Sequence, residues 1–442
     1  MKLYNSLTKQ VEGFGPLKKD QITLYTCGPT VYERAHIGNL ASFIYADTLK
    51  RALKAAFPEH EVKHVMNITD VDDKTIAKSQ QKYPGLPPAE ALKKLTRHFE
   101  DLFKEDLESV GIDTADITFI RATDSIELMQ KLIRQILDKG LAYLTDDGVF
   151  FNTIEYHNKY AGSGKGYGQL TDTAVQGLVT ESQRTNSDEY EKHQAIDFAL
   201  WKVQKPNEPS WDFEVNGKNI AGRPGWHIEC SAMSVGELGQ PFDIHTGGVD
   251  LKFPHHENEI AQTRAATGED LAKVFFHSEH ILVDGKKMSK SLNNFYTLDD
   301  VHAKGFDPLA FRLLILQSHY RSQAHFSWDN LQAAQNRLRD LRMQGGSRGT
   351  TGDLPDAMLD DLNVPLVLSA MSGPVDSSLD QLLGLKLTEQ GQLTAEQDSL
   401  VKQRETARQN KDWAEADRIR QELEEQKIGV NDTDTGPVWY RL

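Results

Sequence analysis

A strand, a loop, a helix and a second strand follow one another near the start of this sequence. Residues 21–27, QITLYTC, carry the β-branched and aromatic side chains typical of a strand, and Gly28 and Pro29 then interrupt it. Residues 40–56 have the periodicity of an amphipathic helix, and residues 61–69, EVKHVMNIT, form a second candidate strand. This order is that of a βαβ unit, whose strands pair in parallel and whose ligands bind at the carboxyl ends of the strands. The sequence therefore predicts an α/β protein with a Rossmann-like parallel sheet.

The rest of the chain changes character several times. Residues 85–140 are strongly helical up to Gly140, and a polar, glycine-rich tract at about 155–195 is predicted to be an insertion. The sheet pattern resumes at FALWK, residues 198–202. Beyond residue 307 the chain is helical again, with a Gly/Ser/Thr-rich linker at 344–356.

An αα-hairpin is predicted near the C-terminus from residues 394–411 and 413–427, with Asp412 as an N-cap and Glu415 as its reciprocal partner. We therefore divide the chain into a catalytic domain, two helical regions and a C-terminal module, at residues 1–306, 307–345, 346–403 and 404–442.

Length and charge limit the range of functions. The 442 residues exceed what one hydrophobic core normally supports. A net charge of −15 opposes nonspecific binding of nucleic acid by the whole molecule, although it allows a local basic face. The first residues lack the apolar core of a signal peptide, and no stretch is apolar enough to span a bilayer. A cytoplasmic protein without membrane contact is expected.

The chain has two cysteines, Cys27 and Cys230, and both lie among Gly, Pro, His and Glu. In the run FPHHENE, His255 and Glu259 are four residues apart and would share one face of a helix. Two thiolates, an imidazole and a carboxylate suit zinc. The alternatives are buried structural thiols or a disulfide, and His256 could replace His255 because spacings of three and four share a face.

The tetrapeptide HIGN stands where the first long helix is expected to begin. Backbone N–H groups at a helix N-terminus favour phosphate, so His36, Gly38 and Asn39 are candidate nucleotide contacts. Taken alone, so short a pattern is better explained by an ordinary helix start.

The loop KMSKS, residues 287–291, is more specific. Lys287, Ser289 and Lys290 suit a mobile loop that neutralises a polyphosphate during displacement at the α-phosphate. An exposed basic turn is the alternative.

Together these motifs resemble those of class I aminoacyl-tRNA synthetases, and of the cysteine-specific family among them, over essentially the whole chain. HIGN and KMSKS resemble the two class I signatures. Five other segments resemble motifs of the cysteine-specific family: CGPTVY, NITDVDDK, GRPGWHIECSAM, FDIHTGGVDL and FPHHENEIAQ. KDWAEADRIRQEL and the final PVW resemble its anticodon-binding end. The resemblance implies a monomer that joins L-cysteine to tRNA(Cys) through a cysteinyl adenylate, with ATP and Mg²⁺.

The resemblance also implies roles for individual residues. One zinc ion per chain would be bound by Cys27, Cys230, His255 and Glu259. The catalytic contacts to ATP would come from His36, Asn39, Lys287 and Lys290, joined by Gly38 and Ser289. The substrate pocket would be lined by Gly28, Thr69, Trp226, His245 and Asp250. The anticodon would be read by Arg408, Trp413, Asp417, Arg420 and Trp439.

Four of these roles have a structural alternative. Trp226 could be a core residue, Asp250 a helix cap, His245 a structural hydrogen-bond partner and Trp413 the anchor of a packed hairpin. The domains implied are a stem-contact region at 307–345, an abbreviated helical bundle at 346–403 and an anticodon module at 404–442.

The chain departs from the family pattern at three places. Asn39 replaces a histidine, Thr246 stands where the family often has glycine, and residues 364–390 are short for the family's helical domain. Two other functions share part of the pattern: a ligase that joins cysteine to an amino-sugar inositol, and a noncatalytic tRNA-binding paralogue.

Overall fold

The computed structural model describes residues 1–171, 184–185, 197–289, 292, 294–343, 355–371, 375–388, 392–433 and 436–441. The chain forms two compact units, described separately below. The first unit comprises Met1–Ala46, Phe57–Glu108 and Asp113–His280, and the second comprises Asp47–Ala56, Ser109–Ile112 and Ile281–Leu442. No helix among the described residues is long and apolar enough to cross a membrane.

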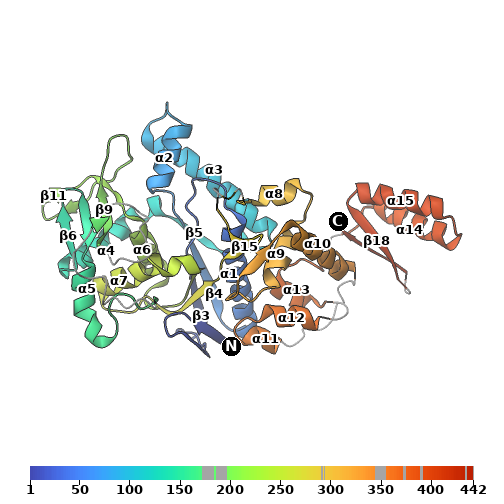
Figure 1. The fold of residues 1–442 in the computed structure, drawn as a ribbon, viewed down its shortest axis with the longest axis horizontal. Helices are drawn as coiled ribbons and strands as arrows, with labels where there is room; N and C mark the ends of the chain where they lie inside the picture. Colours follow the sequence, from blue (N-terminus) through green and yellow to red (C-terminus); the bar gives the residue numbers. More distant parts are fainter. Residues whose placement is uncertain are drawn as a thin grey trace. The chain divides into compact units, whose positions relative to one another are not determined.

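The first unit contains the predicted parallel sheet (Figure 1). Its strands, in spatial order, are β14 (Ala272–Ser278), β13 (Phe242–Gly248), β3 (Gln21–Thr26), β4 (Glu61–Ile68) and β5 (Thr118–Arg121). Every adjacent pair is parallel. The chain after β3 and the end of β13 therefore lie at one edge of the sheet, which confirms the expected fold class.

Helices connect these strands. They are α1 (Ile37–Ala56), α2 (Asp73–Lys82), α3 (Pro88–Ser109), α4 (Ile126–Asp138), α6 (Trp226–Leu238) and α7 (His255–Thr267). The helical stretch predicted at 85–140 is thus interrupted by β5. Gly140 has a φ of 70°, so it follows α4 in the left-handed conformation typical of a helix end.

A second, largely antiparallel sheet lies in the same unit. Its strands are β12 (Gly222–Pro224), β9 (Asp197–Val203), β7 (Gly148–Phe151) and β6 (Ala142–Thr145), with β8 (Arg184–Thr185) parallel to β9. The stretch FALWK belongs to β9 and therefore to this sheet, and not to the parallel sheet as the sequence suggested. A short continuous apolar run marks a buried strand but does not say which sheet the strand joins. Short elements complete the unit: β1 (Lys2–Asn5), β2 (Gln10–Gly13), α5 (Thr153–Tyr160), β10 (Glu214–Val215) and β11 (Lys218–Asn219).

The second unit begins with a small sheet of β15 (Ile281–Val283), β16 (Lys286–Lys287) and β17 (Ala324–Phe326). Its helices before the C-terminal module are α8 (Leu298–Ala303), α9 (Pro308–Leu316), α10 (Trp328–Met343), α11 (Asp356–Leu359), α12 (Val364–Ala370) and α13 (Ser377–Leu383).

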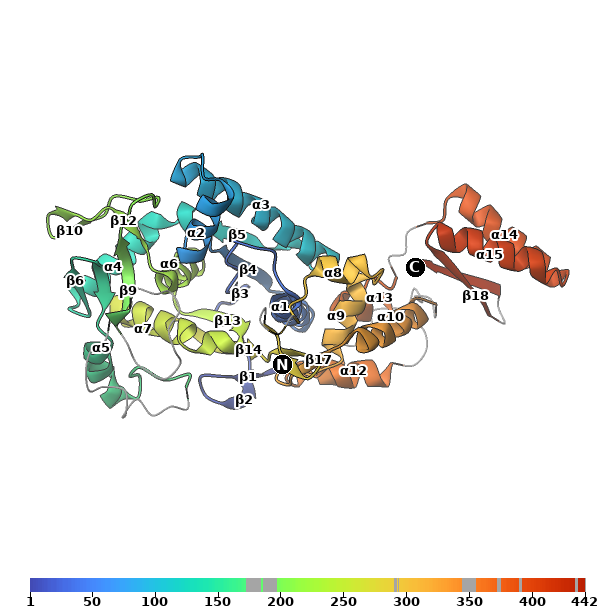
Figure 2. The same cartoon turned by 45° about the horizontal axis from the view of Figure 1, so that its top comes forward.

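The C-terminal module consists of α14 (Ala395–Gln409), α15 (Trp413–Glu425) and a hairpin of β18 (Ile428–Thr433) and β19 (Gly436–Arg441). Figures 1 and 2 both show α14 and α15 side by side, which confirms the predicted αα-hairpin. Asp412 caps α15 by accepting the Glu415 N–H at 3.1 Å. The carboxylate of Glu415 binds Arg418 at 2.9 Å and does not return to the cap.

Candidate active site

The fold brings the two cysteines together. Cys27 follows β3, Cys230 lies in α6, and their Sγ atoms are 3.6 Å apart. This distance is far longer than the ~2.05 Å of a disulfide bond, and both thiols are free and buried. The disulfide alternative is therefore excluded, and the sulfurs form a pair at the sheet edge.

His255 and Glu259 complete the cluster from the first turn and a half of α7. His255 Nε2 lies 3.2 Å from Glu259 Oε1, which is 3.6 Å from Cys27 Sγ. The ligand atoms of Cys27, Cys230, His255 and Glu259 all lie within 4.8 Å of one another. Two sulfurs, one imidazole nitrogen and one carboxylate oxygen at this spacing fit a zinc ion.

A second grouping replaces Cys230 and His255 with His245 and His256 at the same spacing. In that grouping His245 Nε2 contacts Glu259 Oε2 at 2.8 Å, and His256 Nδ1 contacts His277 Nε2 at 2.8 Å. The first grouping suits zinc better because it contains both soft sulfur donors. In the first grouping, His245 is a hydrogen-bond partner of the Glu259 carboxylate, the role that its structural alternative describes.

The protonation states within the cluster follow from burial. Burial, and next the adjacent Cys230, raise the pKa of the Cys27 thiol well above its usual value. Burial lowers the pKa of His255 to about 3, so this imidazole is neutral and can present a lone pair. A cation would offset the cost of ionising the buried thiols, which links metal binding to proton release.

Trp226 and His227 fix the orientation of His255. The indole of Trp226 stacks on the His255 ring with centroids 4.4 Å apart, and His227 Nδ1 lies 2.9 Å from His255 Nδ1. With the shared proton on His255 Nδ1, its Nε2 presents the lone pair to the cluster. His227 was not among the predicted residues, because a buried histidine three residues before a cysteine carries no distinctive sequence signal.

Gly28 and Thr69 are joined by Asn67, which sequence reasoning also missed. The Gly28 N–H donates to Asn67 Oδ1 at 2.7 Å, Asn67 Nδ2 donates to Thr69 Oγ1 at 3.1 Å, and Thr69 donates to Glu229 Oε2 at 2.9 Å. Gly28 is required because a Cβ there would lie 1.8 Å from the Asn67 carbonyl oxygen. The position of Asn67 near the carboxyl end of β4 was the signal that could have identified it.

Asp250 and Thr246 lie near the end of β13. The carboxylate of Asp250 is exposed, with Oδ1 4.0 Å from His280 Nδ1. Thr246 lies within β13 and its hydroxyl bonds to Thr26 Oγ1 at 2.7 Å. The backbone at Thr246 is not left-handed, so its Cβ causes no strain there.

His36 and Asn39 form reciprocal contacts at the start of α1. The Asn39 N–H donates to His36 Nδ1 at 3.2 Å, and the His36 N–H lies 3.4 Å from Asn39 Oδ1. Because Nδ1 accepts a hydrogen bond, a neutral His36 carries its proton on Nε2, which can then donate to a ligand. Asn39 thus supports the orientation of His36.

Lys287 lies on β16 and is exposed, in a hairpin closed by Asp284 and Gly285. Both turn residues have positive φ, of 50° and 74°, which is typical of a two-residue hairpin turn. The side chain of Asn294 bonds to Ser289 N at 2.8 Å and to Lys287 O at 3.2 Å. Lys290 and Ser291 lie outside the described residues.

The candidate anticodon residues lie on the C-terminal module. The Arg408 guanidinium lies over the ring of Trp413 at 5.4 Å, and its Nε is 3.1 Å from Asp432 Oδ2. Trp413 is 55% exposed, so it is not the anchor of a packed hairpin. Asp417 and Arg420 follow it at four and seven residues along α15, on the same face.

Trp439 on β19 is partly buried against the apolar cluster of the module, which contains Ile419 and Leu423. Arg404, which was not predicted, binds Asp432 through two contacts of 2.8 and 2.9 Å and holds β18 to α14.

Two family comparisons match the parts of the chain described above. The family described as tRNA synthetases class I (C) catalytic domain matches residues 13–336, and the cysteinyl-tRNA ligase anticodon binding domain matches residues 390–439. The fold is also similar to Mycobacterium tuberculosis methionyl-tRNA synthetase, with a TM-score of 0.55 over 83% of this chain and 82% of that one, at 15% identity. These matches define a class I tRNA synthetase.

Curated relatives show which family within this class the chain belongs to. A cysteine–tRNA ligase of Chlamydia muridarum is 39% identical over 98% of both chains. One of Opitutus terrae is 40% identical over 96% of this chain and 95% of the relative. The chain belongs to the cysteine–tRNA ligase family.

Proposed function

We propose that this protein joins L-cysteine to tRNA(Cys) in two steps, both driven by one ATP. The cysteine carboxylate attacks the α-phosphate of ATP, which forms cysteinyl adenylate and releases pyrophosphate. A ribose hydroxyl at the tRNA end then attacks the activated carbonyl and releases AMP. The observation that carries the proposal is the four-donor cluster of Cys27, Cys230, His255 and Glu259 at the edge of the parallel sheet.

The donor set fits a zinc ion, and we propose that one zinc per chain is held there. When bound, zinc supplies a soft Lewis acid that prefers the sulfur of cysteine to the hydroxyl of serine. Shape alone separates such near-isosteres by only ~1–3 kcal/mol, so a metal–sulfur contact would remove the need for editing. Four protein donors and the substrate would give an unusually crowded zinc site.

The protein's own residues position the reactants. Trp226, which stacks on His255, would wall the side-chain pocket, and Gly28 and Thr69, which Asn67 links, would lie beside the backbone of the amino acid. His245 supports Glu259. Asp250, whose carboxylate is exposed, would lie at the rim of the pocket.

Phosphate binding is proposed for both signatures. The Nε2–H of His36 would donate to a phosphate oxygen, assisted by the backbone at Gly38 and by Asn39. Lys287, Ser289 and Lys290 would neutralise charge on the α-phosphate, with Mg²⁺ bound to ATP. No side-chain nucleophile is required, because positioning and charge neutralisation supply the catalysis.

The anticodon would be read by Arg408, Trp413, Asp417, Arg420 and Trp439, which would combine stacking with hydrogen bonds to base edges. The match of residues 390–439 to an anticodon-binding domain supports tRNA as the acceptor over an amino-sugar inositol. Action as a cytoplasmic monomer belongs to the same proposal.

Cysteine-dependent exchange of pyrophosphate into ATP, followed by charging of tRNA(Cys), tests this function. We expect both activities, and about one zinc per chain that is lost in Cys230→Ala together with discrimination against serine. Absence of exchange would exclude both ligase functions, and exchange without charging of tRNA would favour the inositol acceptor. A protein that binds tRNA but activates no cysteine would be the noncatalytic paralogue.

A further inference from the structure

The middle residues of FPHHENE, between the two proposed metal ligands on α7, bind a separate segment of the chain. The carboxylate of Glu257 is fully buried and accepts the Gly168 N–H on Oε1 at 2.7 Å and the Leu170 N–H on Oε2 at 2.8 Å. The next residue, Asn258, accepts the Tyr167 hydroxyl at 2.5 Å. Three contacts, from Tyr167, Gly168 and Leu170, thus hold residues 165–170, here called the strap, against α7.

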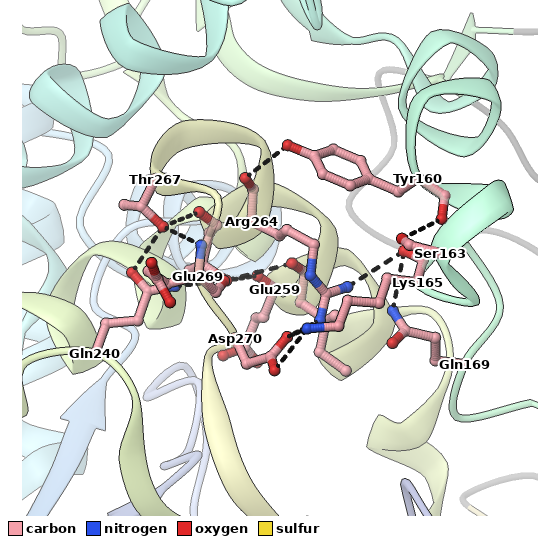
Figure 3. Close-up of polar contacts among 12 residues, drawn as sticks. Tyr160, Ser163, Lys165, Gln169, Gln240, Glu259, Arg264, Thr267, Glu269 and Asp270 are labelled. Carbon is pink, nitrogen blue, oxygen red and sulfur yellow. Dashed lines mark hydrogen bonds and ion pairs between the residues drawn. The ribbon is translucent and has the colours of Figure 1, made fainter.

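The far end of α7 holds the beginning of the same strap. Arg264 Nη1 donates to the Lys165 carbonyl oxygen at 3.3 Å and lies 3.0 Å from the Tyr156 hydroxyl. Asp270 pairs with Arg264 and also with Lys165 Nζ at 2.9 Å (Figure 3). The strap is therefore fixed to α7 at both ends, through side chains that are absent from the proposed metal cluster.

The strap ends in the apolar cluster that contains the sulfur pair. Leu170 is 5% exposed and belongs to one continuous apolar cluster with Tyr25, Cys27, Cys230 and Ile260. Its backbone N–H is one of the two that Glu257 accepts. The same part of α7 therefore carries two of the proposed metal ligands and binds the backbone of an apolar residue in the cluster that contains both thiols.

We propose that Glu257 is a positioning residue, which holds the strap so that Leu170 shields the thiol cluster from water. This inference rests on the proposed zinc site. An apolar shell around a metal controls solvent access and local dielectric, and it strengthens the attraction between a cation and anionic sulfur. The strap would therefore slow loss of the metal and favour the thiolate of the substrate.

Glu257→Gln tests the proposal with little change in volume. One amide N–H would then face the N–H of Gly168 or Leu170, so the strap loses an acceptor. We expect faster hydrogen exchange at the amides of residues 165–170, and zinc release to a chelator faster by about tenfold, the usual effect of losing a supporting contact at a metal site. The KM for cysteine should rise while the KM for ATP stays unchanged.

Two further variants make the test decisive. Glu269→Gln, an exposed glutamate just beyond α7, is the matched control and should behave as wild type. Leu170→Ala keeps both contacts to Glu257, so it should speed zinc release without exposing the Gly168 amide. It also decides the question if Glu257→Gln does not fold.

The proposal is overturned if Glu257→Gln and Leu170→Ala release zinc at the wild-type rate and keep the wild-type KM for cysteine. Failure of the underlying function looks different, because wild-type protein would then contain no zinc or show no pyrophosphate exchange.

Discussion

At the residue scale, the hydrogen bonds at the end of β4 have a fixed direction. A backbone N–H can only donate, so the Asn67 amide must turn its oxygen toward Gly28. Its nitrogen must therefore face Thr69. The oxygen of Thr69 accepts, and its proton points to Glu229. One side chain thus orients the hydroxyl proposed to meet the substrate.

Asn67→Asp should reverse the hydrogen bond that Thr69 makes in this series. The new carboxylate still accepts from Gly28, but it offers no donor to Thr69, whose proton then turns away from Glu229. Loss of a buried hydrogen-bond partner costs about 1–3 kcal/mol, so we expect the KM for cysteine to rise roughly 5- to 100-fold. Steady-state pyrophosphate exchange measures the KM for cysteine. An equal rise in the KM for ATP would show general damage and contradict the assignment.

The ionisation of Asp70 makes the free energy of unfolding depend on pH with a known sign. Burial raises its pKa to about 6, although it accepts hydrogen bonds from the Thr123 N–H and hydroxyl. Because the folded pKa lies above the unfolded value of 3.8, ionisation destabilises the fold progressively as the pH rises from 4 to 6.

Asp70→Asn removes this ionisation while keeping both partners. Its free energy of unfolding relative to wild type should therefore rise between acid and neutral pH, by at most about 3 kcal/mol. Urea denaturation of both proteins at pH 4.5 and pH 7.5 measures the difference. A difference that does not change with pH would mean that Asp70 has an ordinary pKa.

At the element scale, periodicity predicted the helices and the parallel sheet but not every strand. β5 is a four-residue strand between long helices, and β18 and β19 contain glycine, proline, Asn and Asp, which are uncommon in strands. Cys27, Cys230, His255 and Glu259 could be singled out because their chemistry is distinctive. His227 and Glu257 could not, because their roles depend on partners 28 and 89 residues away. Asn67 could have been found only from its place near the carboxyl end of β4, because the glycine that it binds lies 39 residues earlier.

The exposed face of α15 supports a prediction about this element. Trp413→Ala removes a 55% exposed ring that packs against Arg408, so the fold should keep its stability. Stacking of a base on an aromatic ring contributes about 1–3 kcal/mol, so kcat/KM for tRNA charging should fall about 5- to 100-fold. Pyrophosphate exchange should be unchanged. Arg418→Gln on the same helix, which removes contacts to Glu415 and Glu422, is the matched control. Equal losses in both variants would contradict a specific role for Trp413.

At the scale of the whole molecule, the net charge of the protein affects tRNA charging but not cysteine activation. The net charge of −15 repels tRNA at long range, so binding must depend on short-range contacts between basic side chains and phosphates. Each neutralised phosphate contributes about −0.7 to −0.9 to the slope of log affinity against log salt.

The salt dependence of the two activities should therefore differ. With roughly three to four phosphate contacts, kcat/KM for tRNA charging should follow salt with a slope of about −2 to −4 between about 50 and about 200 mM. Pyrophosphate exchange, which needs no tRNA, should vary little over the same range and serves as the internal control. If both activities fell with the same slope, the salt would be acting on cysteine activation. A flat charging profile would instead mean that tRNA is held mainly by uncharged contacts to its bases, because such contacts release no counterions.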